Sequence, residues 1–553
     1  METAPKISLI SSNSQSSKSS RPHDPNPPTS PHSKDPWEVR LSRVVKQFTS
    51  LTLRFWGNML KEVENYLRRK SKQFPINPPK GRHAIINAVL DKTHHQDYLK
   101  SFSQESGMAL DNIEKTFRDY LYEISADMNY LAFPFWDTLL TWVFDTIYEG
   151  LVFSEESLDM IRKVIAGKPV VFVSNHRSHM DYLILSYIFY RHQIPMPHIC
   201  AGTNLSFWPL GPIFRKSGAF FIRRSYEGNK LYSYAVQAYM EEMIREKSCL
   251  EFFIEGGRSR TGKMLPPKMG ILSAIVQAQL KGADEDVVMI PTSVNYESVL
   301  EEKNYMNEQS GASKKTESFW DLFSLKQYLK SKKGKVYIDF GDPLSLKDFL
   351  RKETFKSTDK KEQTKETVNE LAYELTYGIN KSSTVTTSSL VAMALLTHEK
   401  RSIPQLEVDQ KVDLYLDYLR FKSSHLSDPL ERYPSNAVRE SLKNYSRSHL
   451  IHSLHDDEIG EQLYTIPSEK KLLLDYYKNT SLHFFVSIGV LSTILLSVPP
   501  NGQISFKIIE EVFSFVQNLF QYEFMFSRRR SLRDHLEKIF LSGEERMDSN
   551  DSG

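Results

Sequence analysis

The sequence contains only two cysteines among 553 residues, Cys200 and Cys249, and neither has a partner at CxxC spacing. This scarcity argues against a disulfide framework and against a cysteine zinc site. A reducing, cytoplasmic compartment fits the composition. We expect both thiols to be small core residues, because free cysteine is usually buried.

The sequence also lacks a strong charge of either sign. Lys and Arg together number 71, against 68 for Asp and Glu, which leaves a net charge of +3. This balance argues against nucleic acid as a partner, because nucleic-acid binding needs a concentrated basic face. The hydrophobic content of 40% is enough for a large core, and the length predicts roughly two to four folded units.

Long apolar runs are missing as well. The first 40 residues contain no apolar segment of the signal-peptide type, and no uninterrupted run reaches about 18 residues. The nearest candidate is Leu482–Val498, which contains three serines, a threonine and a histidine. We expect a buried core helix there, with a membrane-embedded helix as the alternative. A protein that acts on lipid would then lie on the membrane surface.

The N-terminal part has two compositions. Residues 1–36 are rich in Ser, Pro and Asn and predict a disordered tail, because they cannot bury enough apolar surface to offset their conformational entropy. Residues 37–150 predict a helical domain, since apolar residues recur at three- and four-residue steps. We expect the dense aromatic residues near its end to form a core between helices rather than to face lipid. They are Phe133, Phe135, Trp136, Trp142 and Phe144.

From Gly167 onward, short apolar runs alternate with helical stretches, and this pattern predicts an α/β domain with a mixed sheet covered by helices. The predicted strands are Pro169–Ser174, Phe220–Arg223, Leu250–Ile254, Val287–Asn295 and Lys335–Phe340, with helices near 180–191, 229–246 and 269–281. We place this domain at 151–351. A charged linker over 352–366 and a helical C-terminal domain over 367–545, without a strand, are expected to follow.

The candidate catalytic residues lie in NHRSHMD, directly after the first of these strands. His176 and Asp181 are five positions apart, which on a regular helix would separate them by roughly 140°. They can meet if His176 lies in the loop and Asp181 in the first turn of the next helix. The carboxylate would then hold one ring nitrogen and leave the other to remove a proton. Alternatively, such a pair is simply a histidine and an aspartate at a helix start. His179 is expected to be structural.

Four arginines follow two other predicted strands, in GAFFIRR and in FIEGGRSR. Glycine lets backbone N–H groups approach an anion, and guanidinium groups bind phosphate in a bidentate manner. Because the loop ends of an α/β sheet tend to converge at one crevice, we predict a site for a phosphorylated alcohol beside the histidine. Its residues would be Arg223, Arg224, Glu255, Gly256, Arg258, Ser259 and Arg260. The apolar strand Val288–Thr292 would form a wall for an acyl chain, although a plain core strand would look the same.

The stretches NHRSHMD, GAFFIRR, FIEGGRSR and VMIPTSV resemble, in this order, the four motif blocks of the glycerolipid acyltransferase superfamily. The connecting text is similar to the bacterial membrane-bound glycerol-3-phosphate 1-O-acyltransferase branch. The resemblance runs from about Phe133 to beyond residues 475–485 and leaves the N-terminal tail uncovered. Gly257 stands where many members of the superfamily carry Thr, but the bacterial branch is similar in having two glycines here.

The resemblance implies a reaction and a role for each site residue. His176 would deprotonate the sn-1 hydroxyl of glycerol 3-phosphate, with Asp181 orienting its ring, and the alkoxide would attack acyl-CoA or acyl-acyl carrier protein. No metal or other cofactor is implied. The remaining roles would be phosphate binding by Arg224, Arg258 and Arg260 with help from Arg223, loop shaping by Glu255 and Gly256, and a hydrogen bond from Ser259.

Several alternatives remain open. The acceptor would be dihydroxyacetone phosphate in the related peroxisome-type enzymes, although this chain ends in Asp-Ser-Gly rather than in a peroxisomal tripeptide, and 1-acylglycerol 3-phosphate is another possible acceptor. A non-catalytic lipid-binding scaffold would keep the same fold. A metal-dependent hydrolase would use His176, His179 and Asp181, but the HxHxDH spacing of such sites is absent.

We expect the protein to be membrane-associated, at the cytoplasmic face of the cell membrane. The apolar loop Leu205–Phe214 contains Phe207 and Trp208, and aromatic residues of this kind favour the membrane interface. The basic clusters Arg68–Lys72 and Arg528–Arg530 would meet anionic lipid.

Overall fold

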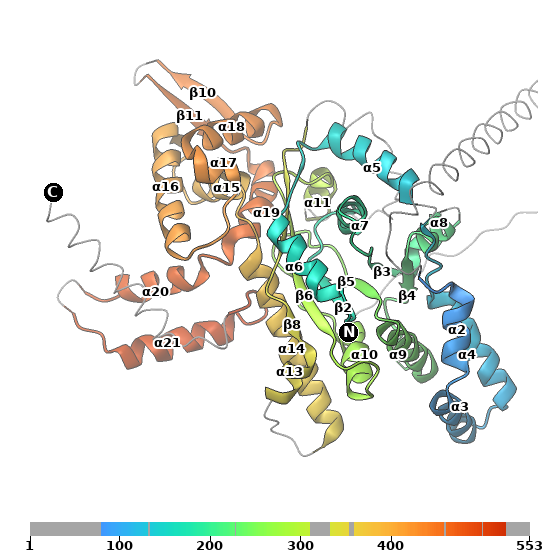
Figure 1. Ribbon diagram of the computed structural model, residues 1–553. Helices are drawn as coiled ribbons and strands as arrows, with labels where there is room; N and C mark the ends of the chain where they lie inside the picture. Colours follow the sequence, from blue (N-terminus) through green and yellow to red (C-terminus); the bar gives the residue numbers. More distant parts are fainter. Residues whose placement is uncertain are drawn as a thin grey trace, which may run out of the picture. The chain divides into compact units, whose positions relative to one another are not determined.

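The computed structural model describes residues 79–526, apart from residues 131–132, 209, 227, 310–331, 353–358, 458–459 and 500–501 (Figure 1). The tail predicted over 1–36 and the part of the predicted helical domain up to residue 78 lie outside the described residues. Both basic clusters, Arg68–Lys72 and Arg528–Arg530, lie outside them too.

A mixed eight-stranded sheet stands at the centre of the described chain. Its strands are β1 (Leu151–Val152), β2 (Val170–Ser174), β3 (His198–Gly202), β4 (Ala219–Ile222), β5 (Cys249–Phe253), β6 (Val288–Tyr296), β7 (Val336–Phe340) and β8 (Leu344–Ser345). Their order is β1-β7-β6-β2-β5-β3-β4, with β8 also paired to β6. Strands β6, β2, β5, β3 and β4 are mutually parallel, whereas β7 and β8 run antiparallel to β6. The carboxyl ends of the five parallel strands therefore lie at one edge.

Helices cover both faces of this sheet, because its central strands are apolar on both sides. Along β2, Val170 and Phe172 belong to one core cluster, and Val171 and Val173 belong to the other. The first cluster includes α5 (Phe133–Ile147), α6 (Glu155–Ile165) and α7 (Asp181–Arg191). The second includes α2 (Arg82–Leu90), α3 (Thr93–Ser106), α4 (Leu110–Ile124), α9 (Lys230–Arg245), α10 (Met269–Leu280), α13 (Leu346–Lys352) and α14 (Lys360–Ser382). Short helices complete this part, namely η3 (Thr203–Leu205), α8 (Leu210–Lys216) and α11 (Glu302–Gln309).

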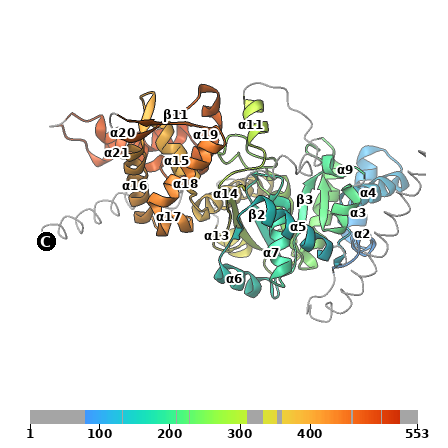
Figure 2. The same ribbon diagram turned by 90° about the horizontal axis from the view of Figure 1, so that it is seen from above.

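Beyond α14 the chain is mainly helical and groups around α15 (Thr387–Leu396), whose residues are nearly all buried (Figure 2). The other elements are α16 (Gln405–Phe421), α17 (Asp428–Arg432), α18 (Pro434–Arg447), η5 (Ser468–Lys470), α19 (Lys471–Leu482), α20 (Val486–Leu496) and α21 (Phe506–Leu519). A three-stranded antiparallel sheet accompanies them, formed by β9 (Ser402–Pro404), β10 (His452–Asp456) and β11 (Glu461–Thr465). The expectation of no strand over 367–545 is therefore wrong. The sequence HSLHD of β10 is polar and exposed, and lacks the apolar alternation on which the prediction relied.

The predicted charged linker over 352–366 is partly helical, because α14 begins at Lys360. The Asp359 side chain caps this helix and accepts a hydrogen bond from the Lys361 backbone N–H at 3.1 Å. Further along α14, Val368, Leu371 and Leu375 are buried in the second core cluster. The helix thus covers the sheet rather than leading away from it. The division into domains over 37–150, 151–351 and 367–545 stays a prediction.

The apolar stretch Leu482–Val498 is not one buried helix. The chain turns after α19, where the half-buried His483 ring contacts the Asn380 carbonyl at 3.0 Å, and α20 then contributes only Leu491 and Ile494 to the interior. The expectation of a buried core helix is therefore wrong for α20. Within the described residues, no single helix is long and apolar enough to cross a bilayer. Among the described residues, one bent pair of helices is long and apolar enough to cross a bilayer, judged by length and composition alone. It consists of Ser468–Leu482 and Val486–Leu496, which meet at 93°.

Between residues 169 and 340, every predicted strand and helix is present within one residue of its expected bounds. Strands β1, β3 and β8 were not predicted: two of them span only two residues, and β3 (HICAG) lacks an uninterrupted apolar run.

Of the dense aromatic residues, Phe133, Trp136 and Phe144 are buried as expected, whereas Trp142 is half exposed. Both cysteines are free, and Cys249 is buried.

Gly262, in the loop after β5, lets this loop pack closely against the backbone of α19. Gly262 has φ +79°, and an added Cβ would lie 2.0 Å from the Tyr476 carbonyl oxygen. We therefore expect Gly262→Ala to destabilise the protein by about 1–3 kcal/mol, through backbone strain and the clash, as a lower unfolding midpoint in urea. Gly489→Ala is the matched control, because nothing lies within 4 Å of that position in α20. Equal stability of the two variants would contradict this packing.

Candidate active site

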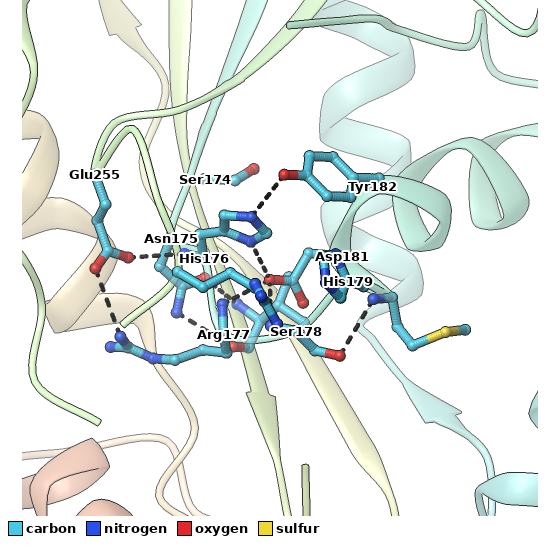
Figure 3. Close-up of polar contacts among 12 residues, drawn as sticks. Ser174, Asn175, His176, Arg177, Ser178, His179, Asp181, Tyr182 and Glu255 are labelled. Carbon is cyan, nitrogen blue, oxygen red and sulfur yellow. Dashed lines mark hydrogen bonds and ion pairs between the residues drawn. The ribbon is translucent and has the colours of Figure 1, made fainter. Parts of the chain in front are cut away.

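His176 lies in the loop between β2 and α7, and Asp181 is the first residue of α7 (Figure 3). The His176 Nδ1 atom is 2.9 Å from Asp181 Oδ2, and both side chains are buried. The chain leaves the strand before it enters the helix, and this break lets two residues five positions apart meet. The structure thus brings the two predicted catalytic residues together.

Asp181 accepts hydrogen bonds from four donors. Besides the imidazole, the backbone N–H groups of Arg177 and Ser178 donate to Oδ2 at 2.6 and 2.9 Å, and the Tyr296 hydroxyl donates to Oδ1. A carboxylate only accepts hydrogen bonds, and these four donors satisfy it. An ionised acceptor requires that His176 Nδ1 carry the ring proton, so the lone pair of the neutral ring lies on Nε2.

Burial sets the protonation state of His176. It lowers the pKa of the imidazole below its usual value, and the nearby Arg258 guanidinium lowers it further, while Asp181 acts in the opposite direction. The neutral form is therefore the resting form at neutral pH. A general base needs this form.

The Tyr182 hydroxyl lies 2.8 Å from His176 Nε2 (Figure 3). Because Nε2 carries the lone pair, the tyrosine donates this hydrogen bond. The two rings are also in edge contact, with centroids 4.9 Å apart and an interplanar angle of 72°. Tyr182 was not predicted from the sequence, since its only signal is that it follows Asp181 directly.

The loop after β5 holds the backbone of His176. Glu255 accepts hydrogen bonds from the backbone N–H groups of His176 and Leu265, at 2.7 and 2.8 Å, and Ser259 N–H donates to the His176 carbonyl at 3.0 Å. The Ser259 hydroxyl donates to the Lys263 carbonyl at 2.6 Å. Both buried side chains are thus bonded inside the protein, where they shape the loop. The hydrogen bond expected from Ser259 to a substrate is already made to the chain itself.

Gly256 allows this loop to turn. Its φ is +63°, and an added Cβ would lie 2.7 Å from the Lys268 side chain. Burial raises the pKa of the neighbouring Glu255, against the Arg177 guanidinium and the two backbone N–H groups that lower it. The loop is therefore fixed both by a glycine conformation and by an enclosed carboxyl group.

The two arginines of this loop are paired with carboxylates from the segment after β6. Arg258 is buried, with Nη1 3.3 Å from Glu301 Oε1 and 3.2 Å from the Tyr305 hydroxyl. Arg260 Nε is 3.0 Å from Glu308 Oε2. Arg258 lies close enough to His176 to affect its pKa. The structure thus brings the Arg258 guanidinium near the His176 ring.

Glu301 also orders the start of α7. Its Oε1 atom accepts hydrogen bonds from the Ser178 hydroxyl and the His179 backbone N–H, at 3.2 and 2.9 Å. The structural role expected for the His179 side chain stays a prediction. Glu301 and Tyr305 were missed by the sequence analysis, because they lie in a stretch without a motif and far along the chain from His176.

The two arginines after β4 have different surroundings. Arg223 makes a bidentate pair with Glu123 of α4, at 2.7 and 2.6 Å, and its guanidinium lies over the Tyr120 and Tyr232 rings. It is therefore tied to the helices beneath the sheet. Arg224 is exposed, and its Nε atom would lie 4.0 Å from a Cβ at Gly202, at the end of β3. Its positive charge also acts to lower the pKa of Tyr182, against the larger effect of burial.

An apolar pocket borders the site from the other direction. Its lining includes Phe133, Trp136, Leu140, Tyr182, Ile199, Leu205 and Phe214, from α5, α7, η3, α8 and β3. Tyr182 both lines this pocket and contacts His176. The strand Val288–Thr292, which we expected to wall an acyl chain, is instead a fully buried central strand, and it contributes no residue to the pocket.

The three residues required by a metal-dependent hydrolase do not form a ligand group. In the part of the chain that the structure describes, three residues that could bind a metal ion lie together elsewhere, at His94, His95 and Glu241. Cationic side chains surround that carboxylate, since Lys92, Arg245 and Lys281 lie 3.9, 3.1 and 3.8 Å from it. These charges repel a metal ion. The absence of a metal from the reaction stays a prediction.

Comparison with known proteins identifies two adjoining regions. Residues 155–295 match the family model described as acyltransferase, and residues 305–547 match the one described as glycerol-3-phosphate acyltransferase C-terminal region. Among solved structures, the 1-acyl-sn-glycerophosphate acyltransferase of Thermotoga maritima covers 58% of this chain and 97% of its own, at 16% identity and a TM-score of 0.25.

Several bacterial relatives carry the name glycerol-3-phosphate acyltransferase. Those of Aeromonas hydrophila and Pseudoalteromonas atlantica are both 34% identical, over 77% and 75% of this chain, and that of Shewanella amazonensis is 32% identical over 78%. The matched regions make up 53%, 51% and 53% of these proteins, so the chain spans about half the length of the curated relatives it matches. These matches show that the chain belongs to the glycerolipid acyltransferase superfamily, in its glycerol-3-phosphate acyltransferase branch.

Proposed function

We propose that the protein is a glycerol-3-phosphate 1-O-acyltransferase. It transfers a fatty acyl group from acyl-CoA or acyl-acyl carrier protein to the sn-1 hydroxyl of glycerol 3-phosphate and forms lysophosphatidate, the first step of phospholipid synthesis. The observation that carries the proposal is the position of the His176 ring. Asp181 holds one nitrogen, Arg258 lies nearby, and Tyr182 joins the other nitrogen to an apolar pocket.

In this reaction His176 Nε2 removes the proton of the sn-1 hydroxyl as its oxygen attacks the thioester carbonyl. The C–O bond forms, the C–S bond then breaks, and the imidazolium returns the proton to the thiolate, which leaves as a thiol. The ionised Asp181 stabilises the imidazolium between these two proton transfers. The acceptor hydroxyl is itself the nucleophile, so no serine or cysteine is acylated.

The phosphate of the acceptor binds to the arginines around the histidine. Arg224 is exposed and makes no hydrogen bond or ion pair with a described residue, so its guanidinium is available to an anion. Arg258 and Arg260 also bind the phosphate, and each exchanges its glutamate partner for it. Arg223, bound to Glu123, helps through its charge.

The acyl chain occupies the apolar pocket. This pocket runs between helices and the ends of β3 and β4, so a chain bound there leads back toward Tyr182 and the histidine. Burial of a fatty chain in such surroundings gains about 0.8 kcal/mol for each methylene group. The thioester end of the donor then lies beside His176.

Replacement of the general base is the first test. We expect His176→Ala to lose at least about 10²–10⁴-fold in kcat, in an assay of acyl transfer from palmitoyl-CoA and from palmitoyl-acyl carrier protein to glycerol 3-phosphate. His398→Ala is the matched control, since that buried ring also contacts a carboxylate, Glu407, at 2.7 Å. It should retain activity.

The same assay compares acceptors, with dihydroxyacetone phosphate and 1-acylglycerol 3-phosphate beside glycerol 3-phosphate. Preference for either competitor would reject the proposed acceptor and keep the acyltransferase chemistry. Full activity of His176→Ala would reject the assigned base. Lipid binding without turnover of any acceptor would favour a scaffold.

Removal of the exposed guanidinium tests the phosphate site. Arg224→Ala should raise KM for glycerol 3-phosphate by roughly ten- to hundredfold, because a hydrogen bond to a charged group is lost, and kcat should change much less. Lys230→Ala removes a positive charge from a neighbouring exposed position and is the control. An unchanged KM in Arg224→Ala would place the phosphate elsewhere.

We further propose that the protein works at the cytoplasmic face of the membrane. The segment Leu205–Phe214 supports this view, because Leu205 and Phe214 line the apolar pocket while Phe207 and Trp208 are 40% and 84% exposed. Aromatic side chains of this kind favour the interface between lipid and water. A fatty chain could thus pass from the membrane to the pocket along one apolar segment.

A flotation experiment tests this contact. Vesicles of phosphatidylglycerol and phosphatidylethanolamine should carry the wild type at low salt and should lose most of the double variant Phe207→Ser, Trp208→Ser. Tyr433→Ser is the control, since Tyr433 is an aromatic residue that is 66% exposed in the C-terminal part. Equal flotation of the double variant and the wild type would exclude this segment as the membrane contact.

A further inference from the structure

The lone pair of the general base is already occupied. A neutral imidazole has a single in-plane lone pair, and in His176 it lies on Nε2 because Asp181 holds the proton on Nδ1. The Tyr182 hydroxyl donates to this lone pair at 2.8 Å. A substrate hydroxyl that gives its proton to His176 needs the same lone pair, so the two hydroxyl groups exclude each other.

Tyr182 also separates His176 from the apolar pocket. Its ring makes edge contacts with the rings of His176 and Phe253, at centroid distances of 4.9 and 5.0 Å, and its other side lines the pocket. The pocket lining includes Tyr182 but not His176. In this conformation, therefore, the general base contacts neither an acceptor hydroxyl nor the interior of the pocket.

We propose that Tyr182 is a gating residue, whose hydroxyl stands in for the acceptor hydroxyl at His176 Nε2 and whose ring must move aside before an alcohol can bind there next to an acyl group in the pocket. Only the identity of the alcohol in this proposal rests on the proposed function. The mutual exclusion of the two hydroxyl groups follows from the geometry alone.

A proton relay through Tyr182 is the competing mechanism. In a relay the acceptor hydroxyl would bind to the tyrosine oxygen, which would take its proton while the phenolic proton passes to Nε2. The acceptor would then lie on the pocket side of the ring. Among the described residues, the pocket lining includes no arginine or lysine that could hold a phosphate, and burial raises the pKa of the phenol. Displacement is therefore favoured over relay.

Tyr182→Phe tests the gate, because it keeps the ring and removes the hydroxyl. With no hydrogen bond to displace, KM for glycerol 3-phosphate should fall roughly two- to tenfold, and kcat should stay within about threefold. Tyr464→Phe, which loses a 2.7 Å hydrogen bond to Gln405 in the C-terminal part, is the matched control. It should leave both constants unchanged.

The pH profile gives a readout that a purely structural role would not move. A hydrogen bond donated to Nε2 stabilises the neutral ring, so its loss should raise the pKa of His176 in the free enzyme. The acid limb of kcat/KM should then move to higher pH by up to about one unit. The acid limb of kcat should not move, because in the bound enzyme the hydroxyl has already left. The charged and titratable groups that face His176, namely Asp181, Arg258 and His179, are the same in both proteins.

A fall in kcat of about 100-fold or more at unchanged KM would overturn the gate in favour of the relay. Constants and acid limbs that match those of Tyr464→Phe would overturn it in favour of a purely structural residue.

A chemical-modification experiment distinguishes failure of the gate from failure of the proposed function. Diethyl pyrocarbonate reacts with unprotonated imidazole nitrogen, and peptide mass spectrometry should show faster modification of His176 in Tyr182→Phe than in the wild type even if no acceptor is acylated. Equal modification rates would reject the gate.

Discussion

The carboxylate of Asp181 is the group on which the catalytic site depends. It accepts hydrogen bonds from two backbone N–H groups, an imidazole N–H and the Tyr296 hydroxyl. These donors come from the loop after β2 and from β6. A buried carboxylate is costly unless it is satisfied in this way. Its ionised state then fixes the tautomer of His176. The reactivity of the site is thus decided by an acceptor that does not itself react.

The sheet makes this arrangement possible by placing three strand ends together. Strand β2 lies between β5 and β6, with Ser174 opposite Phe253 on one side and Thr292 on the other. The loop after β5 can therefore reach the His176 backbone through Glu255 and Ser259, and β6 can deliver Tyr296 to Asp181. Parallel neighbours bring residues about 80 and 120 positions apart into hydrogen-bonding distance.

Arg258 and Arg260 are each held in an ion pair with a glutamate. Arg258 can be buried because Glu301 faces it, and Arg260 has Glu308 as its partner. An unpaired guanidinium in the same place would cost several kcal/mol in lost hydration. The exposed Arg224 bears no such cost and needs no partner. Among the described residues, the site therefore presents the Arg224 guanidinium to solvent and keeps those of Arg258 and Arg260 in ion pairs.

The sequence by itself determined strands β2, β4, β5, β6 and β7, helices α7, α9 and α10, the motif blocks, and the meeting of His176 with Asp181, because these depend on local apolar patterns and on a short loop. It did not determine β10, whose residues are polar, or the bend after Leu482, where composition allowed a continuous helix. Only the tertiary structure decided that Tyr182 covers the base and that Glu301 holds the site arginine. Contacts between side chains from different strand ends leave no periodic signal in the chain, since they arise only after the sheet has set the strands side by side.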